Sequence, residues 1–313
     1  MTVTISGVGA ALPGTVIGND HFAHLDTSHE WIVKRTGIHT RHWLSPDESL
    51  ADLAERASRQ ALADSGRSAH EVDHVLVSTV TPDRITPGVA PELAARLGAP
   101  GPPAVDLNAA CAGFLYALDH ACALIESGRA RCVLVCAAEA LSRITDVTDR
   151  STAVLFGDAA GAVVVTQDGL EGGEGPHFLL GSDGGHTELL YADREERVLR
   201  MSGRQVYEFA VATMAEQTRK VLGARGLRPA DIALFIGHQA NARILRAVAA
   251  ELGVPDDRTE ISVDTVGNTS SASIPFALRQ ARDAGRLRPG DRIVMAAFGA
   301  GFVWGAGVVR WKA

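Results

Sequence analysis

The chain has 313 residues, 46% of them hydrophobic and 21% charged, which suits one large globular domain or two ordinary ones and excludes a disordered protein. Its formal net charge of −7 argues against a general nucleic-acid-binding surface, because such a surface needs basic residues to neutralise phosphates. No apolar run reaches the roughly 18 residues of a membrane-spanning helix, and residues 1–14 predict a strand without the basic start of a signal peptide. We therefore expect a cytoplasmic protein with no membrane or nucleic-acid partner.

Two stretches of the chain predict the same order of elements. Residues 61–82 predict the end of an amphipathic helix, a glycine at Gly66, a short polar link with an acidic residue, and an apolar strand. Residues 221–241 repeat this order, and their glycine, Gly226, lies 160 positions after Gly66.

A second pair of matching segments follows in the same order. Residues 104–114 predict a β-like run that breaks into a helix at Cys111, and residues 260–278 predict the same around Asn268. A glycine that ends the helix comes 17 positions after each of these two residues. The strand expected at 131–140 matches that at 291–300, and the segment from 156 resembles the one from 298.

Four matches in one order indicate the duplication of a β-α-β unit. Strands of continuous Val, Ile and Leu that alternate with helices predict an α/β fold with buried, helix-covered sheets. We assign residues 1–168 to the first half and 169–313 to the second, with the Gly/Glu-rich run 169–175 as the crossover. On this alignment Cys111 and Asn268 occupy equivalent turns that face one cleft.

The four cysteines are Cys111, Cys122, Cys132 and Cys136, with no CxxC pair and no histidine at metal-ligand spacing. We therefore expect neither a disulfide scaffold nor a metal site. Cys111 lies at a strand-to-helix turn, where backbone N–H groups and the helix dipole lower the pKa of a thiol and make it a nucleophile. A buried structural cysteine is the alternative for Cys111, and it is the interpretation that we adopt for the other three.

Three polar residues follow apolar strands or precede helices, where functional groups of α/β folds are often found. His238 directly follows an apolar strand, where α/β folds gather catalytic groups, and Asn241 comes three residues later. Asn268 could cap the helix that follows it. The duplication favours a functional role for Asn268, because it directs that residue and Cys111 toward one cleft.

The motifs DLNAACAGF, GHQANARI and VGNTSSAS resemble the active-site motifs of β-ketoacyl-acyl carrier protein synthase III, in the thiolase-like superfamily. The resemblance runs nearly end to end, through residues 26–43, 148–165, 181–190 and 298–311. It implies a layered αβαβα thiolase-like fold, a homodimer, and a catalytic set of Cys111, His238 and Asn268.

The reaction that the resemblance implies agrees with these side chains. Cys111 would take an acyl group from acyl-CoA, and malonyl-acyl carrier protein would then lose CO₂ to give the attacking carbanion. His238 and Asn268 would donate hydrogen bonds to the enolate oxygen, and the backbone N–H groups of Cys111 and Ala300 would form the oxyanion hole. No cofactor is expected beyond these substrates.

The resemblance also implies a CoA tunnel. Trp31 and Arg150 would sandwich the adenine. The rest of the CoA would be held by four polar residues, Thr27, Arg35, Asn241 and Arg243. Arg243 and Arg246, at i and i+3 of one helix, would form a basic patch for the acidic carrier protein, although Arg246 could equally be an ordinary solvated charge.

Substrate choice depends on an acyl pocket to which Thr86 and Phe156 are assigned. Thr86 aligns with a position that reaches the partner subunit's acyl pocket and is often Phe in relatives restricted to short starters. A small residue predicts a roomier pocket, for branched or longer acyl chains. The segment 191–203 looks shorter than in many relatives and is expected near the tunnel mouth.

Three functions are compatible with the motifs. The first is a condensing enzyme that starts fatty acid synthesis. The second is a related condensing enzyme or acyltransferase that serves a polyketide or other specialised pathway. The third is a non-catalytic scaffold of the same fold, against which the complete Cys-His-Asn set argues.

Overall fold

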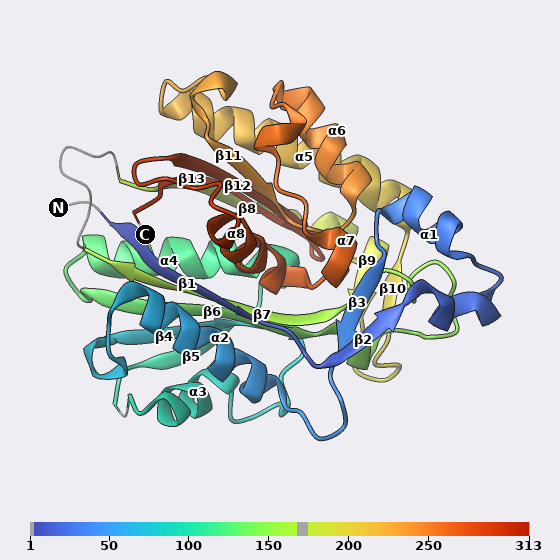
Figure 1. The fold of residues 1–313 in the computed structure, drawn as a ribbon, viewed down its shortest axis with the longest axis horizontal. Helices are drawn as coiled ribbons and strands as arrows, with labels where there is room; N and C mark the ends of the chain where they lie inside the picture. The colour runs from blue at the N-terminus through green and yellow to red at the C-terminus, as the bar shows by residue number, and fades with distance from the viewer. Residues whose placement is uncertain (1–2, 100, 168–174, 313) are drawn as a thin grey trace.

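A computed structural model describes residues 3–99, 101–167 and 175–312. Two sheets with helices on both faces form five layers, as Figure 1 shows from top to bottom. No helix in the described ranges has the length and apolar character needed to cross a membrane. The expected boundary at 168/169 and most of the crossover 169–175 lie outside the described residues.

The first sheet has five strands in the order β1-β7-β6-β4-β5. Its strands are β1 Thr4–Ala11, β4 His74–Ser78, β5 Ala104–Leu107, β6 Cys132–Ala140 and β7 Asp158–Thr166. β1 and β6 run antiparallel to β7, whereas β4 runs parallel to β5 and β6. Every residue of β6 and β7 is buried, which their mainly small and branched apolar residues predict for a sheet covered on both faces.

The second sheet repeats this topology with four strands, in the order β11-β12-β13-β8. They are β8 His177–Ser182, β11 Leu234–Gly237, β12 Arg292–Gly299 and β13 Val303–Arg310. β11 and β12 are parallel, while β13 runs antiparallel to both of its neighbours. The duplication predicted from the sequence is therefore present in the order and direction of the strands.

The prediction of a β-like run from residue 260 is wrong, because no strand forms there. Only an isolated parallel bridge, Thr259 to Phe235, stands where β5 stands in the first half. The chain then turns into the short helix α7 Val263–Val266. The side-chain oxygen of Gln239 accepts hydrogen bonds from the backbone N–H groups of Ser262 and Val263, and this contact replaces a strand ladder.

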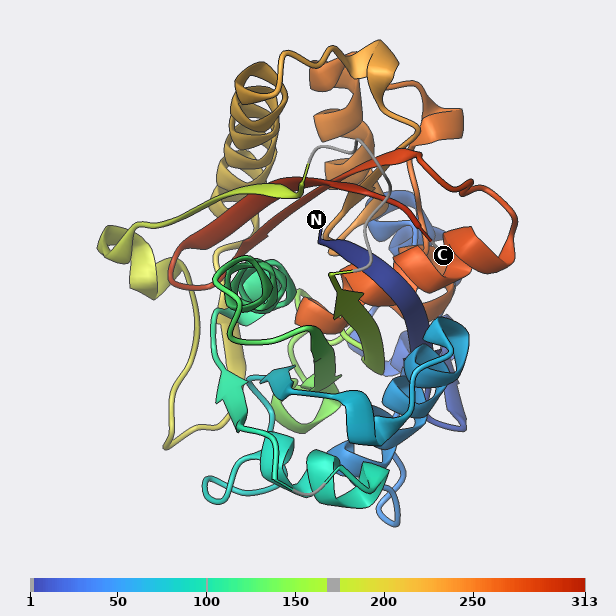
Figure 2. The same ribbon diagram turned by 90° about the vertical axis from the view of Figure 1, so that its left-hand side faces the viewer.

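Helices α4 and α8 form the central layer between the sheets, which the view in Figure 2 confirms for α4 seen end-on. They are α4 Gly113–Glu126 and α8 Ser273–Asp283. Leu118 and Leu278 from these helices share one apolar core with Val133 of β6 and Met295 of β12. This core joins the two halves into one body.

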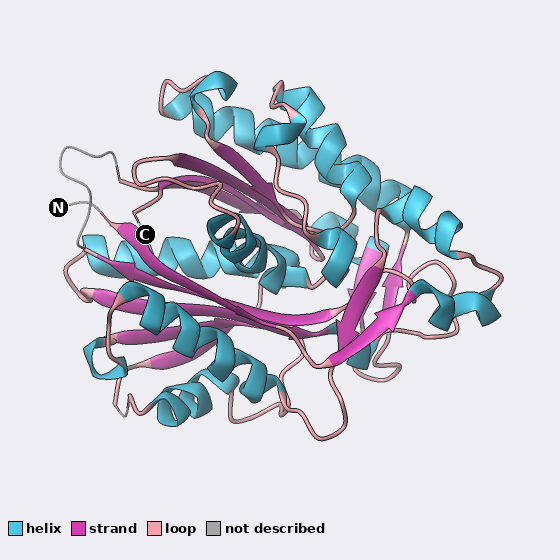
Figure 3. Ribbon diagram, in the orientation of Figure 1, coloured by secondary structure: helices cyan, strands magenta, loops and turns pink. Residues whose placement is uncertain are grey.

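The outer layers each contain two long helices (Figure 3). These are α2 Leu50–Ser65 and α3 Val89–Leu97 on the first sheet, and α5 Gly203–Ala224 and α6 Ala242–Leu252 on the second. The remaining named elements lie at the edge of the body, namely β2 Thr15–Gly18, α1 His29–Thr36, β3 Thr40–Trp43, β9 Leu190–Ala192 and β10 Leu199–Met201.

The structure corrects the residue-by-residue alignment of the two halves. The offset of 160 holds for the starts of β4 and β11 and for the one-turn helices η3 Ala110–Ala112 and η8 Ser270–Ala272. Cys111 therefore corresponds to Ser271, not to Asn268. Helix α8 has 11 residues, whereas α4 has 14. The sequence alignment counted back from the glycine that follows each helix, so it paired Cys111 with a residue three positions too early in the second half.

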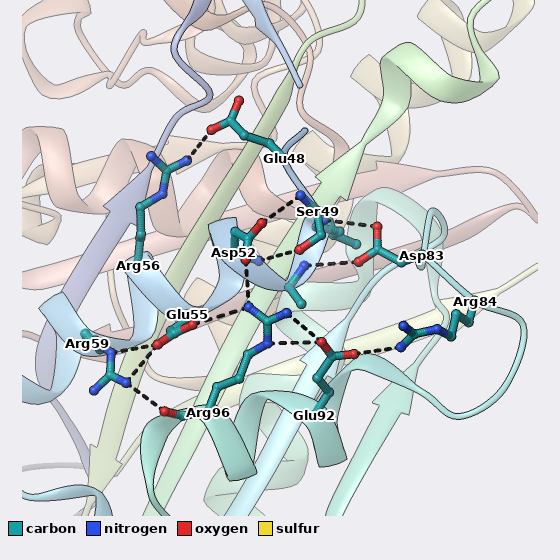
Figure 4. Close-up of polar contacts among 12 residues, drawn as sticks. Glu48, Ser49, Asp52, Glu55, Arg56, Arg59, Asp83, Arg84, Glu92 and Arg96 are labelled. Atoms are coloured by element: carbon teal, nitrogen blue, oxygen red, sulfur yellow. Dashed lines mark hydrogen bonds and ion pairs between the residues drawn. The ribbon is translucent and has the colours of Figure 1, made fainter. Parts of the chain in front are cut away.

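Ion pairs fix the outer helices of the first half and the loop that follows β4 (Figure 4). Arg96 of α3 contacts Asp52 and Glu55 of α2. The carboxylate of Asp83 accepts hydrogen bonds from the first two backbone N–H groups of α2 and also pairs with Arg143. These contacts anchor the segment 79–85, which forms part of the pocket described next.

Candidate active site

A pocket of about 1190 Å³ lies between the two halves and is lined by residues of both. The three residues of the predicted catalytic set, Cys111, His238 and Asn268, all contribute to its wall. Phe156 and Ala300 also line it. The structure thus brings together side chains that are separated by more than half of the chain.

Cys111 lies in η3, between the end of β5 and the start of α4. The end of β12 packs tightly against this turn, since a Cβ on Gly299 would lie 2.7 Å from the Cys111 backbone nitrogen. Only glycine fits there without moving the turn. Ala300, the next residue, therefore reaches the pocket wall beside Cys111.

Cys111 lines the pocket, and the residue as a whole keeps some exposed surface. Its Sγ lies 3.5 Å from the Oγ of Ser270. Desolvation by the protein atoms packed around it raises the pKa of the Cys111 thiol to about 11, and the nearby negative charge of Glu139 acts in the same direction. The expected lowering of this pKa is therefore wrong, because burial outweighs the favourable groups at the turn.

His238 follows β11 directly and is 3% exposed. Burial lowers the pKa of His238 to about 4, so the imidazole is neutral near pH 7. Its Nδ1 lies 2.7 Å from the Oγ of Ser273, and this hydroxyl also accepts the backbone N–H of Gln239. If the Ser273 hydroxyl donates to Nδ1, the imidazole carries its proton on Nε2.

Asn268 is held by its main chain. Its N–H donates to the carbonyl of Leu155, and its carbonyl accepts the N–H of Gly157. Its Oδ1 accepts the backbone N–H of Ser270 at the start of η8. Thr269, not Asn268, is the N-cap of η8, so the alternative interpretation of Asn268 as a cap is wrong. Asn268 lines the pocket, with its amide NH₂ group as the remaining donor.

The residues expected around the adenine cluster outside the pocket wall. The guanidinium carbon of Arg150 lies 4.4 Å from the centroid of the Trp31 ring, and that of Arg35 lies 4.2 Å from it. Arg150 thus stacks directly on Trp31, and the slot expected for the base is closed. The Thr27 hydroxyl donates to the carbonyl of Phe22.

The start of α6 connects this cluster to the pocket. Asn241 caps α6, lines the pocket, and donates from Nδ2 to the carbonyl of Arg35. The guanidinium carbon of Arg243 lies 5.7 Å from the ring centroid of Tyr207, a residue of the pocket wall. Arg243 and Arg246 are both exposed on one face of α6.

The two residues assigned to the acyl pocket lie in different places. Phe156 is buried in the pocket wall. Thr86 is exposed and does not line the pocket of its own chain, although the preceding segment 79–85 does. The hairpin of β9 and β10, which overlaps the segment 191–203 expected near the tunnel mouth, also forms part of the wall.

Family models for 3-oxoacyl-[acyl-carrier-protein] synthase III match residues 105–184, and those for its C-terminal part match residues 222–311. A beta-ketoacyl-[acyl-carrier-protein] synthase III of Rhodospirillum centenum is 46% identical over 98% of both chains. The chain belongs to the β-ketoacyl-acyl carrier protein synthase III family. The crystal structure of a synthase III from Aquifex aeolicus matches with a TM-score of 0.95, 41% identity and coverage of 99% and 100% of the two chains.

The predicted thiolase-like α/β fold is confirmed by these neighbours. The priming β-ketosynthase of the R1128 polyketide biosynthetic pathway has the same fold, with a TM-score of 0.94, 35% identity and coverage of 99% and 96%. The synthase III family thus accounts for the chain from end to end.

Several buried polar residues next to the catalytic set were not predicted from the sequence. Glu139 and Ser271 are fully or almost fully buried next to it, and Ser273 contacts His238. An acidic residue at the end of an otherwise apolar strand was the available signal for Glu139, because a buried carboxylate needs a dedicated set of partners.

Proposed function

We propose that the chain catalyses the decarboxylative Claisen condensation of an acyl-CoA starter with malonyl-acyl carrier protein, through an acyl-cysteine intermediate, to give a 3-oxoacyl-acyl carrier protein. The observation that carries this proposal is the convergence of Cys111, His238 and Asn268 on one pocket. Membership of the synthase III family supports the same reaction class. The chain is accordingly an acyltransferase.

In the first half-reaction, the sulfur of Cys111 attacks the thioester carbonyl of acyl-CoA and CoA leaves as its thiol. The backbone N–H groups of Cys111 and Ala300 stabilise the negative oxygen that forms. The tight packing of Gly299 on the Cys111 turn supports this pairing of donors, since it holds the end of β12 beside the nucleophile.

In the second half-reaction, malonyl-acyl carrier protein loses CO₂ and its thioester becomes an enolate. Nε2–H of neutral His238 and the amide NH₂ of Asn268 donate to the enolate oxygen. The carbanion then attacks the acyl-Cys111 carbonyl and forms a C–C bond. The bond between that carbon and the Cys111 sulfur breaks, and the sulfur takes up a proton from water to restore the free thiol. The lowered pKa of His238 suits this role, because the imidazole stays neutral near pH 7 and donates a hydrogen bond from Nε2.

Substrate binding involves the surface around α1 and α6. Trp31 would stack on the adenine after Arg150 has moved off its ring, and Thr27, Arg35, Asn241 and Arg243 would hold the rest of the CoA. The exposed positions of Arg243 and Arg246 on α6 suit an acidic carrier protein. These assignments need no metal and no cofactor.

The starter would be an acyl group of four or more carbons, because Thr86 is small where a bulky residue would restrict the pocket. The exposure of Thr86 supports its delivery to the acyl pocket of a second copy in a homodimer. We place this reaction in the cytoplasm. Priming of a specialised pathway is not favoured, since the curated relatives at 44–46% identity are named synthase III.

A panel of acyl-CoA starters tests the proposal. Each starter is incubated with malonyl-acyl carrier protein, and the 3-oxoacyl-acyl carrier protein is quantified. We expect condensed product from starters of four or more carbons. A strong preference for acetyl-CoA would overturn the assignment of Thr86, and the absence of product with every starter would overturn the condensation itself.

A further inference from the structure

The turn between β12 and β13 carries one of the two proposed oxyanion donors. It consists of Ala300, Gly301 and Phe302, and the first two of these line the pocket. Glycines on both sides of Ala300, Gly299 and Gly301, give this stretch of backbone more conformational freedom than other residues would. The position of the Ala300 N–H therefore depends on the contacts that the turn makes with other segments.

Backbone hydrogen bonds fasten the end of this turn to the segment that follows β8. The N–H of Phe302 donates to the carbonyl of Asp183 at 2.7 Å, and the N–H of Asp183 donates to the carbonyl of Phe302 at 2.8 Å. This pair continues the ladder between β13 and β8, in which Val303 faces Ser182. Main-chain contacts thus hold Phe302 at the edge of the second sheet.

The side chain of Phe302 is buried in a cluster of four aromatic rings. The ring of His186, in η5 Gly184–Leu189, stacks on it with 5.4 Å between the ring centroids and 7° between the planes. Phe209 of α5 contacts both rings, with its centroid 4.7 Å from that of His186 and 5.2 Å from that of Phe302. Phe298 of β12 lies 4.6 Å from Phe302. The cluster thus connects the turn to η5 and α5.

Asp183 connects the turn and the stacked ring. Its Oδ1 accepts the N–H of Gly185 at 2.9 Å and so caps the start of η5. Its Oδ2 lies 3.2 Å from Nδ1 of His186. The main chain of Asp183 therefore holds Phe302, and its side chain holds the segment that carries His186.

We propose that His186 positions the Ala300 N–H by stacking on Phe302. This inference rests on the proposed oxyanion hole. The packing of Gly299 against Cys111 holds the turn on one side, and the ring stack holds it on the other. Without the His186 ring, a space opens beside Phe302 and the turn has room to shift. A displacement of about 1 Å near the reacting atoms can cost about 10²-fold in rate.

The two half-reactions depend on different donors, and this difference separates a positioning role from general support of the fold. The Ala300 N–H acts while Cys111 is acylated, whereas His238 and Asn268 act while malonyl-acyl carrier protein loses CO₂. Loss of the stack should therefore slow acylation and leave CO₂ release nearly unchanged. A residue that only stabilises the fold would affect both steps to the same degree.

Two rates measured on each variant test the proposal. The first is single-turnover acylation, with an acyl-CoA as the probe and the adduct measured by intact mass. The second is CO₂ release from malonyl-acyl carrier protein without acyl-CoA. His186→Ala should lower the maximal acylation rate at least fivefold, with less than a twofold change in the acyl-CoA concentration at half-maximal rate and in CO₂ release. His186→Phe keeps an aromatic ring without the Asp183 contact, and it should acylate within twofold of the wild type.

His70→Ala is the matched control, because His70 is an exposed histidine of η2 Ala69–Glu71 and does not line the pocket. It should leave both rates unchanged. Wild-type acylation in His186→Ala, or equal losses of acylation and CO₂ release, would overturn the positioning role. Failure of His186→Phe to restore acylation would overturn the role of the ring stack. A wild type that forms no adduct on Cys111 would instead overturn the proposed function.

Discussion

Ser271 occupies in the second half the position that Cys111 occupies in the first. Both lie at the centre of a one-turn helix, and the residue before each, Ala110 or Ser270, has a left-handed backbone with φ of 43° or 48°. The duplicated fold therefore offers two similar turns at the pocket.

A second pair of equivalent positions, in β6 and β12, explains why the two turns differ in the contacts of their central residues. Glu139 and Gly299 also correspond at the offset of 160, since they lie at the same place in β6 and β12. Gly299 has no side chain and leaves the backbone of Cys111 room to pack, whereas the carboxylate of Glu139 binds the hydroxyl of Ser271. The first turn can thus present the Cys111 thiol as a nucleophile. In the second turn, the Ser271 hydroxyl is engaged in a buried hydrogen bond to Glu139.

Gly299→Ala should abolish formation of the acyl adduct. The added Cβ would lie 2.7 Å from the Cys111 nitrogen, so the turn would have to move away from the end of β12. Intact mass after incubation with acyl-CoA provides the measurement. Gly223→Ala, in α5 with no atom within 4 Å of the new Cβ, is the control and should add about 0.5–1 kcal/mol of stability. Normal acylation of Gly299→Ala would refute the close packing.

His238→Ala and Asn268→Ala should separate the two half-reactions. Loss of one donor to a developing oxyanion typically costs about 10²–10³ in rate. We expect a fall of that size in CO₂ release from malonyl-acyl carrier protein, while Cys111 still accepts the acyl group. Equal losses in acylation and in CO₂ release would mean that these residues support the pocket as a whole.

The burial of His238 predicts a specific dependence of stability on pH. Its pKa is about 4 in the folded chain, below the ordinary value, so the unfolded chain binds a proton first as the pH falls. The stability that the neutral form contributes is complete above about pH 6.5 and is lost as the pH falls toward 4, by about 3 kcal/mol. Urea unfolding at several pH values measures it, with His238→Asn as the reference. An unchanged difference between the two proteins from pH 7 to pH 4 would show that His238 titrates normally.

Trp31→Ala should weaken the binding of acyl-CoA through its nucleotide. Stacking of a base on an aromatic ring is worth about 1–3 kcal/mol, so KM should rise roughly 5- to 150-fold with little change in kcat. The matched control is the same acyl group on pantetheine, which lacks the adenine and should show no difference between wild type and variant. A similar rise with both substrates would place the nucleotide elsewhere.

The general plan of the molecule could be predicted because it depends on patterns along the chain. Gly66 and Gly226 both end helices in a left-handed conformation at the predicted places. Buried strands follow each of them, as unbroken apolar runs indicate. The catalytic set could also be named, because motif order is visible in the sequence and the pocket brings Cys111, His238 and Asn268 together.

The predictions that failed concern features that depend on contacts between segments distant in the chain. The counterpart of Cys111 was misplaced because α8 is one turn shorter than α4, which a count of residues cannot reveal. The pKa of Cys111 was predicted in the wrong direction because desolvation raises it, and residues distant in the chain, Ser270 and Gly299, pack against the Cys111 turn. Glu139 escaped notice because its partners, Val80, Thr81 and Ser271, are far from it in the chain.

The central claim is that Cys111 carries the acyl group. Incubation of the chain with an acyl-CoA in the absence of malonyl-acyl carrier protein, followed by intact mass and peptide mapping, tests it most directly. The account predicts one acyl group per chain, on the peptide that contains Cys111, and none in Cys111→Ala. The buried Cys122, Cys132 and Cys136 remain in that variant as internal controls. An adduct that persists in Cys111→Ala, or that maps to another residue in the wild type, would contradict the account.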